Sequence, residues 1–341
     1  MRYTLLGNSG LRVSEVALGT MTFGTDWGWG ASAGESARQF ELFAEAGGTF
    51  IDTANKYTNG TAESILGELL AADRDHFVVG TKYSLNVRDG DLNAGGKHRK
   101  SLVRALEASL RRLRTDYLDI LWLHAWDYLT PPEEVMRALD DQVRLGKVLY
   151  LGISDTPAWV VAQMQTLAAD RGWSGFAGLQ AEYSLVQRDA ERELIPMARG
   201  LGLGLLAWGP LGAGVLSGKY ASPGTPASQR RLADVDPGRL AIARTVADIA
   251  GELGLSSSVV ALAWLRSQGG VIPILGARTS QQLSDNLTCL DANLPPDVLA
   301  RLDQASHITR GFPHDFLASS DFVFGGMSAQ LDLPPGRSAH G

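Results

Sequence analysis

The stretch YLDILWLH, residues 117–124, is apolar almost from end to end and finishes on a histidine. A strand with one face in water alternates apolar and polar residues, whereas a near-continuous apolar run indicates burial on both faces. Such burial is typical of a parallel sheet that is covered by helices. The stretch therefore predicts a central strand of an α/β fold.

Similar short apolar runs recur along the chain and alternate with longer segments of helical period. The predicted strands are residues 16–19, 49–52, 77–82, 117–124, 148–154, 176–180, 204–208 and 271–276. The predicted helices are residues 33–46, 62–70, 98–114, 131–144, 156–170, 189–199, 239–253, 256–267 and 279–288. Eight units of a strand followed by helix predict a closed (β/α)8 TIM barrel.

A doubly wound sheet is the alternative with the same alternation. Its dinucleotide fingerprint is absent, because the glycines of GLGLGLL (200–206) do not have the GxGxxG spacing. A small β-hairpin with its turn at residues 8–10 is predicted ahead of the barrel. Residues 217–238 are rich in Ser, Pro and Gly and too long for an ordinary connection, which favours a functional loop.

The C-terminal tail, about residues 306–341, is irregular but carries several aromatic rings. These rings are Phe312, Phe316, Phe322 and Phe324. Because exposed rings are costly in water, we expect the tail to pack on the barrel. The expected organisation is thus a single barrel domain over residues 1–341.

Composition excludes several classes of protein. The chain is 45% hydrophobic and 20% charged, which is typical of a globular protein. Its net charge of −6 argues against a nucleic-acid surface. Cys289 is the only cysteine, so no intrachain disulfide or cysteine-rich metal site can form. With no signal-peptide core and no apolar run of about 20 residues, we expect a cytoplasmic protein that neither enters a membrane nor binds metal.

Ionisable side chains follow three consecutive predicted strands. In FIDTANKYTNG (50–60), Asp52 ends a strand and Tyr57 follows it, while Lys82 ends the next strand and His124 the one after. In a barrel of this type the carboxyl ends of the strands meet at one end, where chemistry takes place. We therefore expect these four side chains to lie together.

The residue types of this group suit proton transfer to an oxygen. A phenol with an ordinary pKa of about 10 is a poor donor at neutral pH, but a nearby ammonium lowers that pKa. Lys82 can supply this field, Asp52 can hold Lys82 in place, and His124 can orient a carbonyl. The group therefore predicts protonation of an oxygen that is becoming an alkoxide.

The sequence resembles the aldo-keto reductase superfamily over roughly residues 1–290. The fragments that carry the resemblance are GTMTFG at 19–24, DTANKY at 52–57, GTKYS at 80–84, SLRRLRTDYLDILWLH at 109–124, GKVLYLGIS at 146–154, LQAEYSL at 179–185, AWGPLGAGVLSGK at 207–219 and GARTSQQLSDN at 276–286. The resemblance implies reduction of an aldehyde or ketone, with hydride from NADPH to the carbonyl carbon. Tyr57 would be the proton donor, tuned by Asp52 and Lys82, and His124 would orient the carbonyl.

The resemblance also implies a cofactor that lies extended across the barrel rather than on a glycine-rich turn. The implied cofactor-binding residues are Thr20, Ser154, Asp155, Gln180, Trp208, Pro210, Leu211, Gly212, Leu216, Gly218, Lys219, Gly276, Arg278, Gln282 and Asn286. Trp208 would stack on the nicotinamide, with Ser154 and Gln180 near its carboxamide. Arg278 can grip a 2′-phosphate, which favours NADPH over NADH.

Three positions depart from the family pattern. Asp155 stands where the family commonly has Asn, and a carboxylate can accept from a carboxamide but cannot donate to it. Gly209 replaces a common Ser, and Thr58-Asn59-Gly60 replaces a Gly directly after the tyrosine. We therefore expect an altered cofactor affinity and a longer loop beside Tyr57.

Aromatic residues in the predicted loops point to a ring-bearing or hydrophobic carbonyl substrate. The candidates for substrate contact are Trp27, Trp29, Trp126 and Tyr128. Two other functions remain open. One is a non-catalytic NADP(H)-binding regulatory subunit of the same fold, and the other is a barrel hydrolase using Asp52 and Glu182 as paired carboxylates. A homo-oligomer is possible on the sequence alone.

Overall fold

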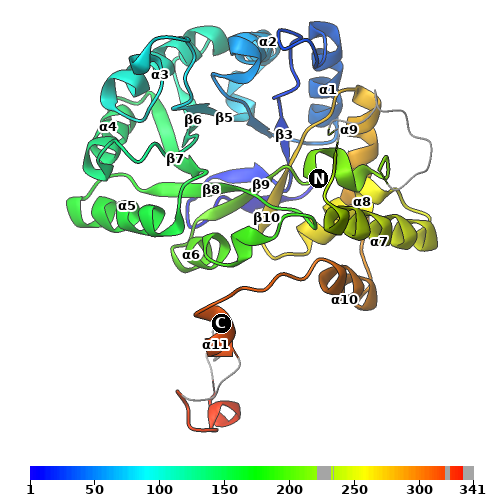
Figure 1. Cartoon of the computed structure of the whole chain (residues 1–341). Coiled ribbons are helices and arrows are strands. Elements are labelled where there is room, and N and C mark those ends of the chain that lie inside the picture. The colour runs from blue at the N-terminus through cyan, green and yellow to red at the C-terminus, as the bar shows by residue number, and fades with distance from the viewer. Residues whose placement is uncertain (221–231, 233, 319–322, 333–341) are drawn as a thin grey trace.

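The computed structural model describes residues 1–220, 232, 234–318 and 323–332. Within these residues, eight parallel strands form a closed barrel that is surrounded by helices (Figure 1). The barrel strands are β3 (Ala17–Gly19), β4 (Phe50–Asp52), β5 (Val78–Tyr83), β6 (Leu118–Leu123), β7 (Val148–Ser154), β8 (Phe176–Glu182), β9 (Gly204–Trp208) and β10 (Val271–Leu275). The predicted TIM barrel is confirmed, because each predicted strand is present.

The helices follow the strands in chain order. They are α1 (Ala33–Glu45), α2 (Thr61–Leu69), α3 (Arg99–Leu113), α4 (Pro132–Arg144), α5 (Ala158–Arg171), α6 (Leu194–Gly200), α7 (Pro237–Leu253), α8 (Ser257–Arg266), α9 (Ser280–Leu287), α10 (Pro296–Ala305) and α11 (His314–Ala318). The prediction of one helix over residues 189–199 is wrong. A separate 3₁₀ turn occupies Asp189–Glu191, and α6 starts at Leu194, so that Pro196 falls in its first turn, where proline is tolerated.

The barrel interior explains why YLDILWLH is so apolar. Trp122 of β6 is fully buried and fills the space that three interior glycines leave open. A Cβ atom on Gly152 would lie 2.1 Å from the Trp122 ring, and one on Gly80 would lie 2.4 Å from it. The large ring and the small residues therefore require one another, as the packed interior of such a barrel demands.

The N-terminal hairpin covers one end of the barrel. It consists of β1 (Tyr3–Leu5) and β2 (Arg12–Ser14), as predicted. Leu6 is fully buried, and the backbone N–H of Asn8 donates to the carbonyl of Gly202 at 2.8 Å. A Cβ atom on Gly7 would lie 2.4 Å from the same carbonyl oxygen, so only glycine permits this approach. The hairpin closes the end at which the strands begin, which leaves the opposite end for chemistry.

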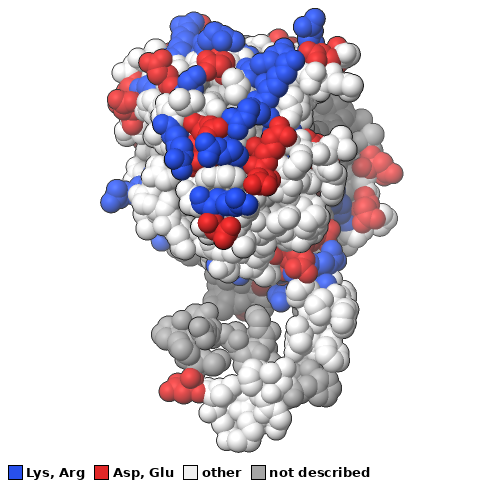
Figure 2. All heavy atoms as spheres, turned by 90° about the vertical axis from the view of Figure 1, so that its left-hand side faces the viewer, with Lys and Arg blue, Asp and Glu red and all other residues white. Residues whose placement is uncertain are grey.

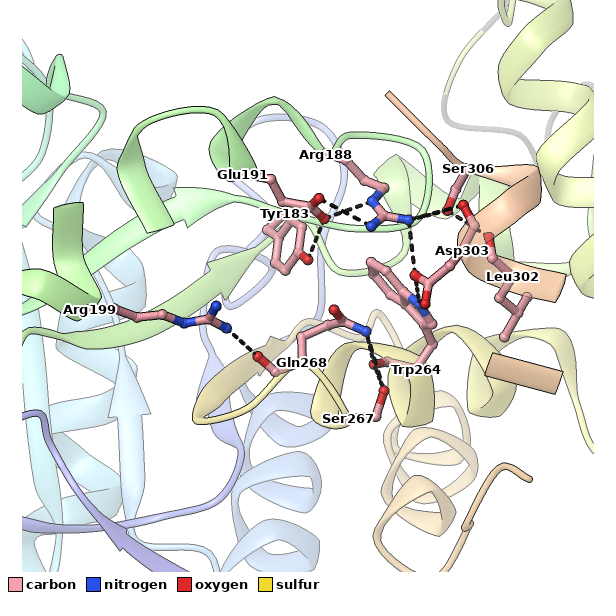
Figure 3. Close-up of polar contacts among 10 residues, drawn as sticks. All are labelled: Tyr183, Arg188, Glu191, Arg199, Trp264, Ser267, Gln268, Leu302, Asp303 and Ser306. Atoms are coloured by element: carbon pink, nitrogen blue, oxygen red, sulfur yellow. Dashed lines mark hydrogen bonds and ion pairs between the residues drawn. The ribbon is translucent and has the colours of Figure 1, made fainter. Parts of the chain in front are cut away.

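Helix α10, which the sequence did not predict, is fastened to the barrel by Arg188 (Figure 3). The guanidinium of Arg188 pairs with Glu191 at 2.7 Å and with Asp303 of α10 at 3.0 Å. The indole Nε1 of Trp264 in α8 also donates to Asp303, at 3.0 Å. Three segments that are distant in sequence therefore meet at Asp303.

The C-terminal tail differs from its prediction. Figures 1 and 2 both show the segment around α11 projecting away from the barrel. Phe312 is 86% exposed and its ring lies 6.2 Å from that of Phe316, while Phe322 lies outside the described residues. The described base of the tail is held by polar contacts, including one of 2.9 Å between His314 and Glu193. These polar anchors position the segment without burying Phe312.

Charges of both signs are interspersed on the side where α3, α4 and α5 lie (Figure 2). Many of them are paired, for example Arg99 and Arg137, both of which contact Asp141. The Arg99 pair joins α3 to α4, whereas the Arg137 pair lies within α4, and each surface pair of this kind contributes little stability. Within the described residues, no single helix has the length and apolar character to cross a membrane, although the bent pair of α7 and α8 meets that test together.

Candidate active site

The carboxyl ends of the barrel strands form an open end, called the mouth below, and three of the four predicted catalytic residues are in direct contact there. The Lys82 ammonium donates to Asp52 Oδ2 at 2.5 Å, to the Thr53 carbonyl at 2.9 Å and to the Tyr57 hydroxyl at 3.1 Å. His124 follows β6, and its ring lies edge-on to Tyr57 with the ring centres 6.1 Å apart. The structure thus brings the group together.

Lys82 and Asp52 form a buried ion pair whose side chains are each 3% exposed. Burial is the largest single influence on the pKa of Lys82 and lowers it. The interactions with Asp52 and Tyr57 together outweigh burial, so the pKa of Lys82 lies above its ordinary value. The second carboxylate oxygen of Asp52 accepts from the Gln180 amide at 2.6 Å. Lys82 is therefore held charged beneath the phenol.

The expected direction of the Tyr57 pKa shift is wrong. Burial raises the pKa of the Tyr57 phenol above its ordinary value, and this effect outweighs the lowering by the Lys82 ammonium. The sequence showed the cation but not how much water the fold removes from the phenol. A raised pKa keeps Tyr57 protonated at neutral pH, as a proton donor must be.

His124 is a neutral imidazole in this environment. Burial, and to a smaller extent the charge on Lys82, lowers the pKa of His124 to about 3. Its Nδ1 atom is buried and has no hydrogen-bond partner among the described residues. A neutral ring with a nitrogen that makes no hydrogen bond is better suited to hydrogen bonding with a substrate than to donating a proton to it.

The pKa of His124 leads to a prediction about pH. We expect kcat for carbonyl reduction to show no ionisation of this histidine between about pH 5 and 8, the range where an ordinary histidine titrates. Because the folded pKa is below the unfolded value, the stabilisation by neutral His124 is present above pH 6.5 and is lost as pH falls toward 3. Initial rates at saturating substrate test the first point. An inflection near pH 6.5 in the wild type that is absent from His124→Gln would contradict it.

The departure from the family at residues 58–60 is a compact turn, not the longer loop that was expected. Thr58 has φ 43° and Asn59 has φ 56°, and helix α2 begins directly after Gly60. A β-branched residue rarely adopts this left-handed conformation. The buried Thr58 hydroxyl compensates by donating to the Phe23 carbonyl at 2.7 Å and accepting from the Ala62 N–H at 3.0 Å. This turn fixes the backbone next to Tyr57.

The residues that the resemblance assigns to a nicotinamide adjoin the catalytic group. Asp155 follows β7, and its Oδ1 accepts from the Trp208 indole N–H at 3.1 Å. Ser154 and Gln180 are in register on neighbouring strands, and both are buried. The Gln180 amide nitrogen donates to Asp52, whereas the Gln180 oxygen Oε1 is buried and has no hydrogen-bond partner among the described residues. This oxygen can accept a hydrogen bond from a ligand.

The segment after β9 has an irregular backbone that only small residues allow. Within the 3₁₀ segment Gly212–Ser217, Ala213 and Gly214 are consecutively left-handed, with φ of 56° and 92°. Gly209, Gly212 and Gly218 also have positive φ. Such turns form nests of backbone N–H groups that bind anions. The other predicted cofactor residues of this segment, Pro210, Leu211, Leu216 and Lys219, lie in or beside it, whereas most of the long predicted loop lies outside the described residues.

The predicted adenosine end lies at the start of α9. Thr279 caps this helix, and the Arg278 N–H donates to Gln282 at 3.0 Å, while Asn286 is buried one turn further on. The Arg278 side chain is exposed and pairs with no carboxylate in the described part of the chain. Thr20 directly follows the neighbouring strand β3, is fully buried and donates to the Asp52 carbonyl at 3.2 Å.

The four predicted substrate residues do not form a single cluster. The ring centres of Trp27 and Trp29 are 5.6 Å apart, whereas Tyr128 is 73% exposed.

Trp126 contacts a residue that the sequence did not predict: the buried ammonium of Lys97 is 3.2 Å from the Trp126 ring centre. Burial lowers the pKa of Lys97 to about 8. Nothing in the sequence marked this lysine, because a lysine before a helix is usually exposed.

Comparison with known proteins identifies the family of the chain. The profile of the Aldo/keto reductase family matches residues 15–307. The chain belongs to this family and is an oxidoreductase of carbonyl groups. No group of three histidine, cysteine or acidic side chains within the described residues is placed to hold a metal.

Three relatives illustrate the similarity. The chain is 38% identical to norsolorinic acid reductase stcV of Emericella nidulans, over 92% of this chain and 83% of the relative. It is 37% identical to aryl-alcohol dehydrogenase GME11368 of Pestalotiopsis microspora, over 96% and 86%. It is 34% identical to aldo-keto reductase ausK of Emericella nidulans, over 92% and 84%.

Proposed function

We propose that the chain is an NADPH-dependent reductase of aldehydes or ketones in which Tyr57 donates the proton. The position of Lys82 is the observation that carries the proposal. An ammonium has three donors, and those of Lys82 are all used, by Asp52, Thr53 and Tyr57. The Tyr57 oxygen is therefore an acceptor from Lys82, which leaves its own proton free for a substrate oxygen.

The mechanism follows from this arrangement. A bound nicotinamide supplies hydride to the carbonyl carbon. As negative charge grows on the carbonyl oxygen, Tyr57 donates its proton to that oxygen. The phenolate that remains is stabilised by the Lys82 ammonium, which Asp52 holds in place, and neutral His124 can orient the same oxygen. The complete group favours an enzyme over a non-catalytic subunit, and a hydrolase has no use for Tyr57 paired with Lys82.

Features of the mouth support a nicotinamide cofactor. The free oxygen of Gln180 can accept from a carboxamide, and the Trp208 indole offers a face for stacking. The left-handed backbone at Ala213 and Gly214 suits a pyrophosphate, and the exposed guanidinium of Arg278 suits a 2′-phosphate. These residues would hold NADPH across the mouth.

The substrate that we propose is an aromatic carbonyl compound. Trp27 and Trp29 lie in the loop after β3, and Trp126 lies two residues after His124, so two loops that follow strands at the mouth carry large rings. The names of the relatives, norsolorinic acid reductase and aryl-alcohol dehydrogenase, support the same class. Rings of this kind favour flat, apolar substrates.

Cofactor choice tests the proposal. We expect oxidation of NADPH by a panel of aromatic aldehydes and ketones, with lower kcat/KM for NADH. Arg278→Gln should raise the KM for NADPH by about 10- to 100-fold, the value of a hydrogen bond between charged groups, and should leave NADH almost unchanged. Arg301→Gln, which removes an exposed arginine of α10, serves as the control. If no compound of the panel were reduced with NADPH, the proposed function would be refuted.

A further inference from the structure

Asp155 presents a carboxylate at the mouth in a fixed position. Its backbone has φ 39°, and its carbonyl accepts from the Trp126 N–H at 3.2 Å. Its side-chain Oδ1 accepts from the Trp208 indole at 3.1 Å. The residue is exposed, and its contact with the Trp208 indole puts the carboxylate beside the ring on which the proposed nicotinamide would stack.

The charge on Asp155 acts on the catalytic group. It contributes to the raised pKa of Tyr57. Burial raises the pKa of Asp155 itself above its ordinary value, while the hydrogen bond from Trp208 and the charge on Lys82 act in the opposite direction and favour the carboxylate. No lysine or arginine in the described part of the chain forms an ion pair with it, because the ammonium of Lys82 is bound to Asp52. Asp155 is thus a negative charge without a direct partner.

The hydrogen bonds of Asp155 do not require that charge. An asparagine could accept from Trp208 equally well and is also tolerated in the left-handed region. The chemistry of the proposed cofactor does give the charge a use. The nicotinamide ring is neutral in the reduced form and carries a positive charge in the oxidised form, so a fixed anion beside it discriminates between the two.

We propose that Asp155 makes the site bind the oxidised cofactor more tightly relative to the reduced one. This inference rests on the proposed function, because it needs a nicotinamide beside Trp208. By favouring the product form of the cofactor, the carboxylate shifts the equilibrium on the protein toward carbonyl reduction. Asp155 would then act as an electrostatic determinant of direction rather than as a proton donor.

Calorimetric titration of the whole chain with NADP⁺ and with NADPH tests the inference without relying on activity. Asp155→Asn should raise the ratio of Kd for NADP⁺ to Kd for NADPH about ten-fold, as expected for one charge at short range. Asp155→Gly should shift the ratio similarly, because glycine also adopts this positive φ without strain and also removes the charge. The second variant covers the case in which the first does not fold.

Glu182→Gln is the matched control, since it removes a different carboxylate, a half-buried one that lies beside Trp208 in the sheet. We expect this control to change the ratio much less. An unchanged ratio in both Asp155 variants, or an equal change in the control, overturns the inference while the proposed function stands. A wild-type chain that binds neither form overturns the proposed function, and the inference with it.

Discussion

Replacing Tyr57 with phenylalanine is expected to lower kcat for carbonyl reduction by about 10²- to 10⁴-fold, the range that a positioned general acid contributes. The ring and its packing remain, and only the hydroxyl that accepts from Lys82 at 3.1 Å is lost. Hydride transfer would then have to proceed without a proton donor beside the developing oxyanion. Stopped-flow or steady-state rates with an aromatic aldehyde measure the loss.

Binding of NADPH should survive this substitution, because Tyr57 contributes no charge that the cofactor needs. Tyr83→Phe is a matched control from the same region. The Tyr83 hydroxyl is buried and has no partner among the described residues, so its removal should leave kcat unchanged. A folded Tyr57→Phe protein that reduces carbonyls as fast as the wild type would refute the mechanism.

Replacing Lys82 with methionine should damage both activity and stability. Asp52, which is 2% exposed, would keep only the Gln180 amide as a side-chain donor. Breaking a buried ion pair by removing one partner typically costs about 3–5 kcal/mol of unfolding free energy. The proton donor also loses the cation that stabilises its phenolate. Urea unfolding, together with kcat, measures the two effects.

A double variant separates these effects. Asp52→Asn combined with Lys82→Met removes the unpaired charge and should recover part of the stability, but none of the activity. Glu252→Gln provides the comparison, because it breaks an exposed pair with Arg301 that solvent screens and that contributes little stability. If Lys82→Met were as stable as the Glu252 variant, the buried pair would not have the importance assigned to it.

The barrel and its catalytic group could be predicted because both are local in the sequence. A run such as YLDILWLH indicates a strand that is buried on both faces, and the residue at its carboxyl end indicates which side chain lies at the mouth. Signals for two missed features were also present. Pro196 fits only the first turn of a helix, which excludes a helix that starts at residue 189, and Pro295-Pro296 precedes the apolar pattern of α10.

Other features depend on distances that no local pattern contains. The hydrogen bond from the Gln180 amide to Asp52 joins residues that are far apart in sequence. The direction of the Tyr57 pKa shift depends on how completely the fold excludes water from the phenol. The burial of Lys97 against Trp126 is likewise set by two loops that meet only after folding. Rings in the tail suggested docking, yet the structure leaves Phe312 exposed.

Closure of the barrel has a consequence for synthesis on the ribosome. The last strand, β10, pairs with the first, β3, so that Ile274 lies beside Ala17. Until β10 has emerged, the nascent sheet has unpaired edges at β3 and β9, and free strand edges invite pairing with other chains. Such long-range pairing also makes folding slow. A growing chain therefore stays vulnerable to aggregation, and open to chaperones, until most of its length has been translated.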